Sequence, residues 1–180
     1  MPTRNITLLA LTLFLAGCVS HQSYPTGWAQ LAQVSTDGCP QVIGTFLNQG
    51  ESRGEFGTTK LTFELFSRST SRYRADRVSI QFRNANTLSI RALLGDSALD
   101  ELTLSREKKE FSCKEGFLVI QGLSDFHKEG GFGISYETVF LARSEDGFLM
   151  VKGVSSGIGF LLFIPAAGST SSWTRYPPAK

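Results

Sequence analysis

The chain has 180 residues, with 18 Lys and Arg against 16 Asp and Glu, so its formal net charge is +2. This length favours a single domain with one hydrophobic core. The near balance of charges argues against a general nucleic-acid binder, which usually carries a clear basic excess, and we expect no nucleic-acid partner.

Residues 1–17 have the features of an export signal. One positive charge, Arg4, precedes an apolar run from Ile6 to Leu15 that only Thr7 and Thr12 interrupt. A membrane-spanning helix needs about 20 apolar residues, so this run is about half as long as a span and suits the apolar region of a signal peptide. We expect residues 1–17 to be absent from the mature protein.

The apolar run ends in Leu15-Ala16-Gly17-Cys18, which resembles the lipobox of bacterial lipoproteins. The resemblance implies cleavage between Gly17 and Cys18, diacylglycerol on the Cys18 thiol and an acyl chain such as palmitate on the new α-amino group. Each buried CH₂ contributes about 0.8 kcal/mol of membrane affinity, so two or three chains would hold the protein durably on a membrane. A plain secretory signal with an incidental cysteine is the alternative.

The residues after Cys18 bear on the destination of the protein. In Gram-negative lipoproteins an Asp after the lipidated Cys often retains the protein in the inner membrane, whereas Val19 and Ser20 follow here. For a Gram-negative source, the resemblance therefore implies an outer-membrane protein that faces the periplasm. Its membrane contact would be the lipid on Cys18.

Residues 18–38 are expected to be the lipidated N-terminus, as the resemblance implies, and their composition predicts a flexible tether. Ser, Pro and Gly interrupt any apolar period over this stretch, and about 20 flexible residues have a root-mean-square reach of about 25 Å. In the alternative, Trp28, Leu31 and Val34 form one helical turn that docks on the domain.

Residues 39–176 are predicted to form a single β domain, followed by a tail at 177–180. Lys114-Glu115-Gly116 and Ser144–Gly147 have the composition of hairpin turns. Alternating or continuous apolar residues predict strands on both sides of these turns and elsewhere: 42–47, 77–82, 88–94, 102–104, 111–113, 117–120, 139–142, 148–151, 157–164 and 172–176. The segment 60–66 suits a strand or a short helix, and Leu61, Leu65 and Phe66 favour the helix.

The predicted fold is therefore all-β, an antiparallel meander of about 8 to 10 short strands that forms a barrel or a barrel-like structure, with one short helix at most. Closure would protect strand edges from aggregation. Motifs such as Gly44-Thr45-Phe46-Leu47-Asn48 and Trp173-Thr174-Arg175-Tyr176 resemble small proteobacterial lipoproteins without an assigned activity. Ile43–Phe46, with an Arg near the end of the chain, resembles a lipocalin-type barrel, although that family typically has Trp where Phe46 stands.

Once Cys18 is assigned to lipid, Cys39 and Cys113 are the two cysteines that remain. In an oxidising periplasm such a pair usually forms a disulfide, and a closed loop of about 74 residues stabilises the fold by about 4 kcal/mol in the chain-entropy model. Together with His21 and His127 they offer no zinc-type ligand spacing. We expect no metal and no cofactor.

Two motifs resemble catalytic sites but lack the required context. Gly153–Gly157 matches the G-x-S-x-G nucleophile elbow, but no His follows His127, and an elbow needs a later His and a following helix; we interpret it as a glycine-rich hairpin turn. Asp125, His127 and Glu129 alternate, yet Lys128 and Gly130-Gly131 indicate an exposed loop in which such residues are solvated.

Arg68, Arg72, Arg74 and Arg77 form the densest positive cluster and are candidate anion ligands, because Arg makes bidentate contacts with phosphate and carboxylate groups. A solvated loop is the alternative. The absence of a catalytic set favours a non-enzymatic envelope protein whose β domain binds an apolar ligand, a lipid or an envelope protein. The alternatives are a cell-wall or glycan-acting enzyme, with carboxylates such as Asp100, Glu101 and Asp125, and a structural or assembly accessory without a small ligand.

Overall fold

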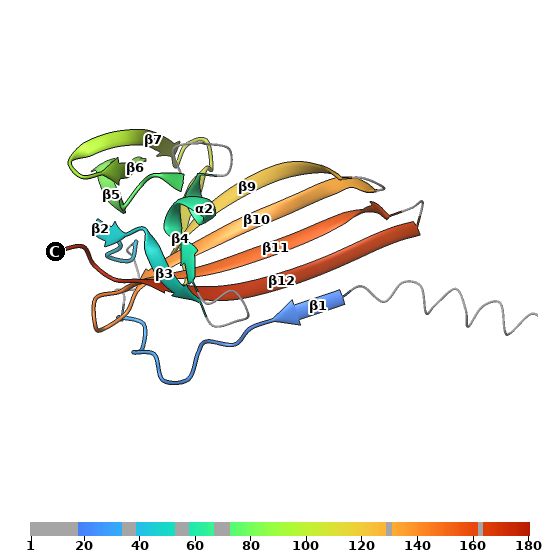
Figure 1. Cartoon of the computed structure of the whole chain (residues 1–180), viewed down its shortest axis with the longest axis horizontal. Coiled ribbons are helices and arrows are strands. Elements are labelled where there is room, and N and C mark those ends of the chain that lie inside the picture. Colours follow the sequence, from blue (N-terminus) through green and yellow to red (C-terminus); the bar gives the residue numbers. More distant parts are fainter. Residues whose placement is uncertain (1–17, 34–38, 53–57, 67–72, 129–130, 162–163) are drawn as a thin grey trace, which may run out of the picture.

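The computed structural model describes residues 18–33, 39–52, 58–66, 73–128, 131–161 and 164–180 (Figure 1). These residues form two β-sheets and one short helix, and nearly all strand pairs are antiparallel, which confirms the all-β prediction. Over these described residues, neither sheet closes on itself. None of the helices in the described ranges is long and apolar enough to cross a membrane.

The large sheet has eight strands and contains the longest elements of the molecule. Its order is β4-β3-β12-β11-β10-β9-β8, and β1 pairs in parallel with β12. The strands are β1 (Cys18–His21), β3 (Gln49–Ser52), β4 (Thr58–Lys60), β8 (Phe111–Lys114), β9 (Phe117–Lys128), β10 (Gly131–Arg143), β11 (Leu149–Leu161) and β12 (Ile164–Tyr176).

The small sheet has four strands in the order β2-β5-β6-β7. They are β2 (Gly44–Leu47), β5 (Arg77–Asn84), β6 (Thr87–Leu94) and β7 (Ser97–Ser105). This sheet covers one end of the large sheet, whereas β9 to β12 extend well beyond it (Figure 1). We call the covered end of these four strands the basal half and the extension the distal half.

The hydrophobic core lies between the small sheet and the basal half. Ile80 and Ile90 of the small sheet are fully buried in one cluster with Leu141 and Leu149 of the large sheet. A disulfide joins Cys39 to Cys113 at the border of this cluster, with their Cα atoms 5.0 Å apart. The predicted cysteine pair is thus present.

The helix α2 (Leu61–Leu65) closes one side of the core and confirms the helical interpretation of this segment. Its first turn is held by Asn48, whose side-chain oxygen accepts the Thr62 N–H at 2.9 Å and whose backbone carbonyl accepts the Leu61 N–H at 2.8 Å. The first N–H groups of a helix have no partner within the helix, so Asn48 supplies partners from outside it. Asn48 also donates to the Ala75 carbonyl and is buried.

Both predicted hairpins are present. Glu115 and Gly116 have φ of 52° and 81° between β8 and β9, and Gly147 has φ of 89° between β10 and β11, which is the left-handed region that glycine adopts at no steric cost.

The turn predicted at Gly153–Gly157 is wrong. These residues lie inside β11, which runs without interruption from Leu149 to Leu161. Small neighbours permit this arrangement, because Gly153 and Gly157 stand beside Ser172 and Ser135 respectively. Likewise, Asp125 and His127 lie in β9 and not in a loop, while Glu129 lies outside the described residues.

Candidate functional site

One face of the large sheet changes character from its basal to its distal half. We call it the outer face because the small sheet packs on the other side. In the basal half, Phe140 of β10 is in register with Lys152 of β11, which pairs with Trp173 of β12. Alternate residues along a strand share a face, so the outer face continues distally through Tyr136 and Ile134.

The N-terminal segment covers the basal half of the outer face. The Tyr24 ring meets the Trp173 ring edge-on with centroids 5.0 Å apart, and Trp28 and Leu31 pack on the same cluster. The Arg175 guanidinium lies over the Trp28 ring, 5.1 Å from its centroid. Residues 18–33 thus lie along the sheet, where the sequence predicted a flexible tether, and Trp28 and Leu31 dock without forming a helix.

The distal half of the outer face exposes its apolar side chains. Ile158 is 61% exposed, Tyr136 is 52% exposed and Val19 is 66% exposed, and Ile134 and Phe160 are also exposed. Ile134 pairs with Ile158, which pairs with Ala167, so the residues form continuous rows across three strands. We call Val19, Ile134, Tyr136, Ile158 and Phe160 the distal patch.

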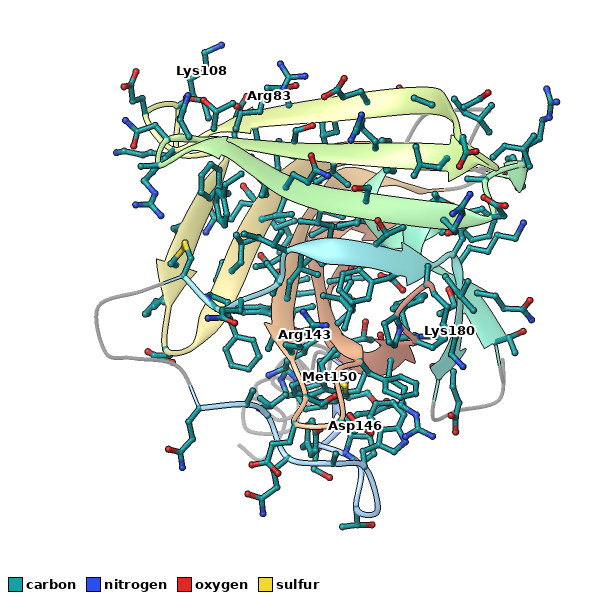
Figure 2. All side chains as sticks on the ribbon, turned by 90° about the vertical axis from the view of Figure 1, so that its left-hand side faces the viewer. Arg83, Lys108, Arg143, Asp146, Met150 and Lys180 are labelled. Carbon is teal, nitrogen blue, oxygen red and sulfur yellow. A yellow bond between two sulfur atoms is a disulfide. The ribbon has the colours of Figure 1, made fainter. Side chains whose placement is uncertain are left out.

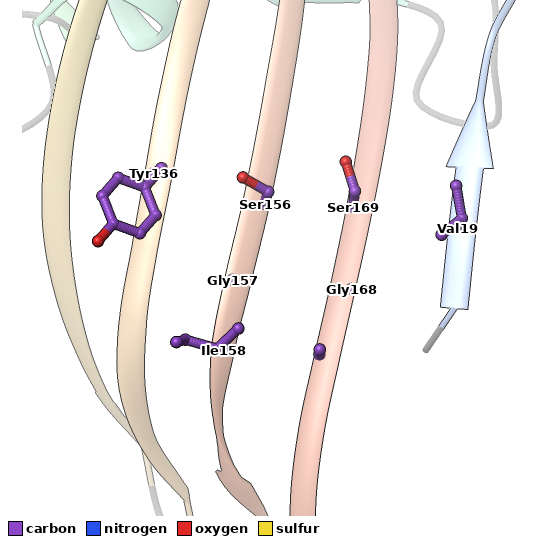
Figure 3. Close-up of a pocket in the computed structure, with 8 residues that line it drawn as sticks. Val19, Tyr136, Ser156, Gly157, Ile158, Gly168 and Ser169 are labelled. Carbon is purple, nitrogen blue, oxygen red and sulfur yellow. The ribbon is translucent and has the colours of Figure 1, made fainter. Parts of the chain in front are cut away.

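A shallow hollow of about 240 Å³ lies on this patch (Figure 3). Tyr136, Ile158, Ala167 and Val19 provide its apolar lining, and Ser156 and Ser169 add hydroxyl groups. The backbone of Gly157 and Gly168 also borders the hollow. The mostly apolar lining suits an apolar ligand more than a polar one.

The hairpin formed by β11 and β12 has no charge over most of its length. From Gly153 to Thr174 the sequence contains no Asp, Glu, Lys, Arg or His. Charged residues are instead common in the small sheet, where Arg83 lies on its outer side (Figure 2). An exposed apolar patch of this kind usually marks a contact with a protein, a membrane or a ligand.

Cys18 lies at the border of the distal patch. It is the first residue of β1, and its Cα is in register with Gly168 of β12, while Val19 is in register with Ser169. The predicted lipidation site is therefore level with the rows that contain Ile158 and Tyr136.

A second pocket lies on the opposite face of the sheet, next to α2. It is lined by Phe63, Glu64 and Glu137, and hydroxyl groups come from Ser155, Thr170 and Ser172. We call it the Glu64 pocket. Burial raises the pKa of the Glu64 carboxyl, and the nearby negative charge of Glu137 raises it further.

Tyr176 lies in the core close to Glu64. Burial raises the pKa of its phenol, and the charge of Glu64 adds to this effect. The Thr59 and Thr174 hydroxyls partly oppose this rise in the pKa of Tyr176. Their contacts with the phenol are not full hydrogen bonds, because the Tyr176 oxygen has no hydrogen-bond partner among the described residues.

The predicted arginine cluster is described only in part, since Arg68 and Arg72 lie outside the described residues. Arg74 is exposed. Arg77 donates to the Gly95 carbonyl and forms ion pairs with Asp76 and Asp96, each at 3.6 Å, so it holds the end of the small sheet together.

The carboxylates named as catalytic alternatives do not converge. Asp100 and Glu101 lie on β7 of the small sheet, whereas Asp125 lies on β9 of the large sheet. Hydrogen bonds from Ser89 and Arg83 lower the pKa of Glu101. Within the described ranges, no three His, Cys, Asp or Glu residues are grouped as metal ligands would be.

Sequence reasoning missed the distal patch and the Glu64 pocket. The uncharged stretch from Gly153 to Thr174, with Ile158 and Phe160 at alternate positions, was the available signal. Comparisons with protein families, curated proteins and solved structures found no match for this chain.

Proposed function

We propose that this chain is a lipid-anchored envelope protein, attached through Cys18 to the periplasmic side of the outer membrane, that acts by binding and not by catalysis. Its β domain binds an apolar ligand, a lipid or an envelope protein through the distal patch. The observation that carries the proposal is the exposed apolar row of Tyr136, Ile158 and Val19 beside Cys18.

The fold leaves apolar side chains of the distal patch in water. Burying an exposed Ile or Phe side chain contributes about 1.5 to 3 kcal/mol. Ile158 gains less than half of this energy on folding and Phe160 only part of it, since they remain 61% and 44% exposed. A ligand that covers the hollow gains the remainder.

The lipid anchor is tested by the fate of Cys18. The full chain is expressed in a Gram-negative bacterium with labelled palmitate, next to a Cys18→Ser variant. We expect the wild type to take up the label, to begin at Cys18 and to sediment with outer membranes, whereas the variant takes up none. A wild-type chain with a free Cys18 thiol would contradict the proposal.

The binding surface is tested by titrating a fluorescent fatty acid into a form that begins at Val19. We expect Ile158→Asp to weaken binding by about tenfold, which corresponds to about 1.4 kcal/mol, while the control Leu94→Asp binds like the wild type, because Leu94 is exposed on the small sheet. A wild type that neither binds the probe nor crosslinks to an envelope protein would refute this part of the proposal.

A glycan-acting enzyme is the second candidate, and the Glu64 pocket favours it. A general acid needs a raised pKa, and the burial of Glu64 beside Glu137 provides one. If Glu64→Gln abolished a cell-wall hydrolase activity of a folded protein, this candidate would replace the first.

A further inference from the structure

We infer that the distal patch rests on the lipid leaflet that holds the acyl chains of Cys18, so that the domain lies against its own membrane in a fixed orientation. This inference rests on the proposed function, because it requires lipid on Cys18.

The first step is the position of the anchor. Cys18 is not at the end of a free linker, because β1 pairs with β12 over four residues, from Cys18–Gly168 to His21–Ser171. Neighbouring strands lie about 4.8 Å apart. The Cys18 backbone, with the α-amino group that an acyl chain would occupy, therefore lies about one strand spacing from the Gly168 backbone, which borders the hollow.

The second step is the chemistry of the surface. The distal patch combines aliphatic side chains with Tyr136 and Phe160, and aromatic residues are enriched where protein meets the boundary between lipid and water. Ser156 and Ser169 are polar but uncharged. The stretch from Gly153 to Thr174 carries no charge, and Asp125 of β9, in register with Ile134, lies at the border of the patch.

The third step is the size of the patch. A stable protein interface presents about 20 to 30 residues on each side, whereas the distal patch has the five residues defined above. These few side chains favour a leaflet over a protein as the surface that covers the patch. A lipid anchor already keeps the domain at the membrane, so the contact forms at a high effective concentration and five side chains suffice to orient the domain.

The fourth step is the location of the charged surface. The small sheet packs on the face of the large sheet opposite the distal patch. Arg83 and Lys108 lie on its outer side, and Met150 and Asp146 lie at the opposite end of the molecule (Figure 2). With the distal patch on the leaflet, the charged side of the small sheet faces the periplasm.

The test uses the full lipidated chain in vesicles of phosphatidylethanolamine and phosphatidylglycerol, with or without brominated acyl chains, because bromine quenches Trp fluorescence on contact. Ile158→Trp places a reporter in the patch. Leu94→Trp is the matched control, since Leu94 is 40% exposed but lies on the small sheet. Trp28 and Trp173 contribute the same background to both variants.

We expect brominated lipid to reduce the added fluorescence of Ile158→Trp at least twofold and to leave that of Leu94→Trp unchanged. Far-ultraviolet circular dichroism checks that both variants are folded. Equal quenching of the two reporters, or none at Ile158→Trp in a chain whose mass confirms the lipid, overturns the leaflet contact alone. Emission from Ile158→Trp that shifts with protein density but not with bromine indicates a second copy on the patch and also overturns it. A chain without lipid on Cys18 overturns this inference and the proposed function together.

Discussion

The basal and distal halves of β9 to β12 belong to the same strands but meet different surroundings. On the outer face, Met150 in the basal half of β11 is buried in the cluster that Tyr24 and Trp28 cover, whereas Ile158, further along the same face of the strand, is 61% exposed. The cause is the reach of the cover. Tyr24, Trp28 and Leu31 pack over the basal half of the outer face, while the 13 residues of β11 span about 43 Å and extend past them. On the other face, the small sheet likewise covers only the basal end of the long strands (Figure 1).

Apolar residues on one strand therefore serve two purposes. In the basal half they stabilise the fold, and in the distal half they are available for a ligand or a membrane. Substitutions in the two halves should therefore separate stability from binding, and the expected effects below run from the largest to the smallest.

The disulfide should have the largest effect on the basal half. Replacing both Cys39 and Cys113 with Ala opens a loop of 74 residues, and we expect the free energy of unfolding to fall by about 4 kcal/mol. Urea unfolding of the oxidised wild type and the double variant measures this. Fatty-acid binding at the distal patch should stay unchanged under native conditions, and a loss of binding in the folded variant would show that the two halves are coupled.

A pair of alanine variants compares the two halves directly. Leu141→Ala, in the buried core, should lower the free energy of unfolding by about 2 to 5 kcal/mol. Ile158→Ala, in the exposed patch, should change it by less than about 0.5 kcal/mol. Urea titrations of both variants provide the values. Similar losses at the two positions would mean that the distal half is buried in the native protein.

The smallest effect concerns the pH dependence of stability at Glu64. Burial raises the pKa of Glu64 in the folded state. At pH values between the unfolded and the folded pKa, the folded protein therefore binds more protons than the unfolded chain. The contribution of Glu64 to stability is therefore fully present in acid and is lost as the pH rises through the folded pKa. We expect Glu64→Gln to be more stable than the wild type at neutral pH, with the difference shrinking in acid.

Glu101→Gln is the control of opposite sign. Ser89 and Arg83 lower the pKa of Glu101, so its contribution is present above the unfolded pKa and is lost as the pH falls through the folded pKa. Urea unfolding over a pH series measures both variants. If the stability of Glu64→Gln relative to the wild type changed with pH in the same direction as that of Glu101→Gln, burial would not raise the pKa of Glu64.

The features that the sequence predicted correctly depend on short local motifs or, for the disulfide, on assigning one of the three cysteines to lipid. The hairpins at 114–116 and 144–147 depend on glycines in the left-handed region, which short motifs reveal. The pairing of Cys39 with Cys113 follows once Cys18 is set aside.

The features that escaped prediction depend on contacts between distant segments. Gly153 and Gly157 have the composition of a turn, but pairing with β10 and β12 keeps them extended. The distal patch joins Val19, Tyr136 and Ile158 from three strands, and their alignment depends on register across two hairpins and on the parallel pairing of β1. Tyr24 and Trp28 lie in an irregular segment whose docking on Trp173 no periodicity indicates.

The most direct test of the contrast between the two halves is photolabelling of the full lipidated chain in vesicles that contain a diazirine lipid, with the labelled peptides identified by mass spectrometry. The account predicts label on peptides that contain Tyr136, Ile158 and Phe160, and none on the peptides of β5 to β7. Label spread evenly over both sheets, or confined to the small sheet, would contradict it.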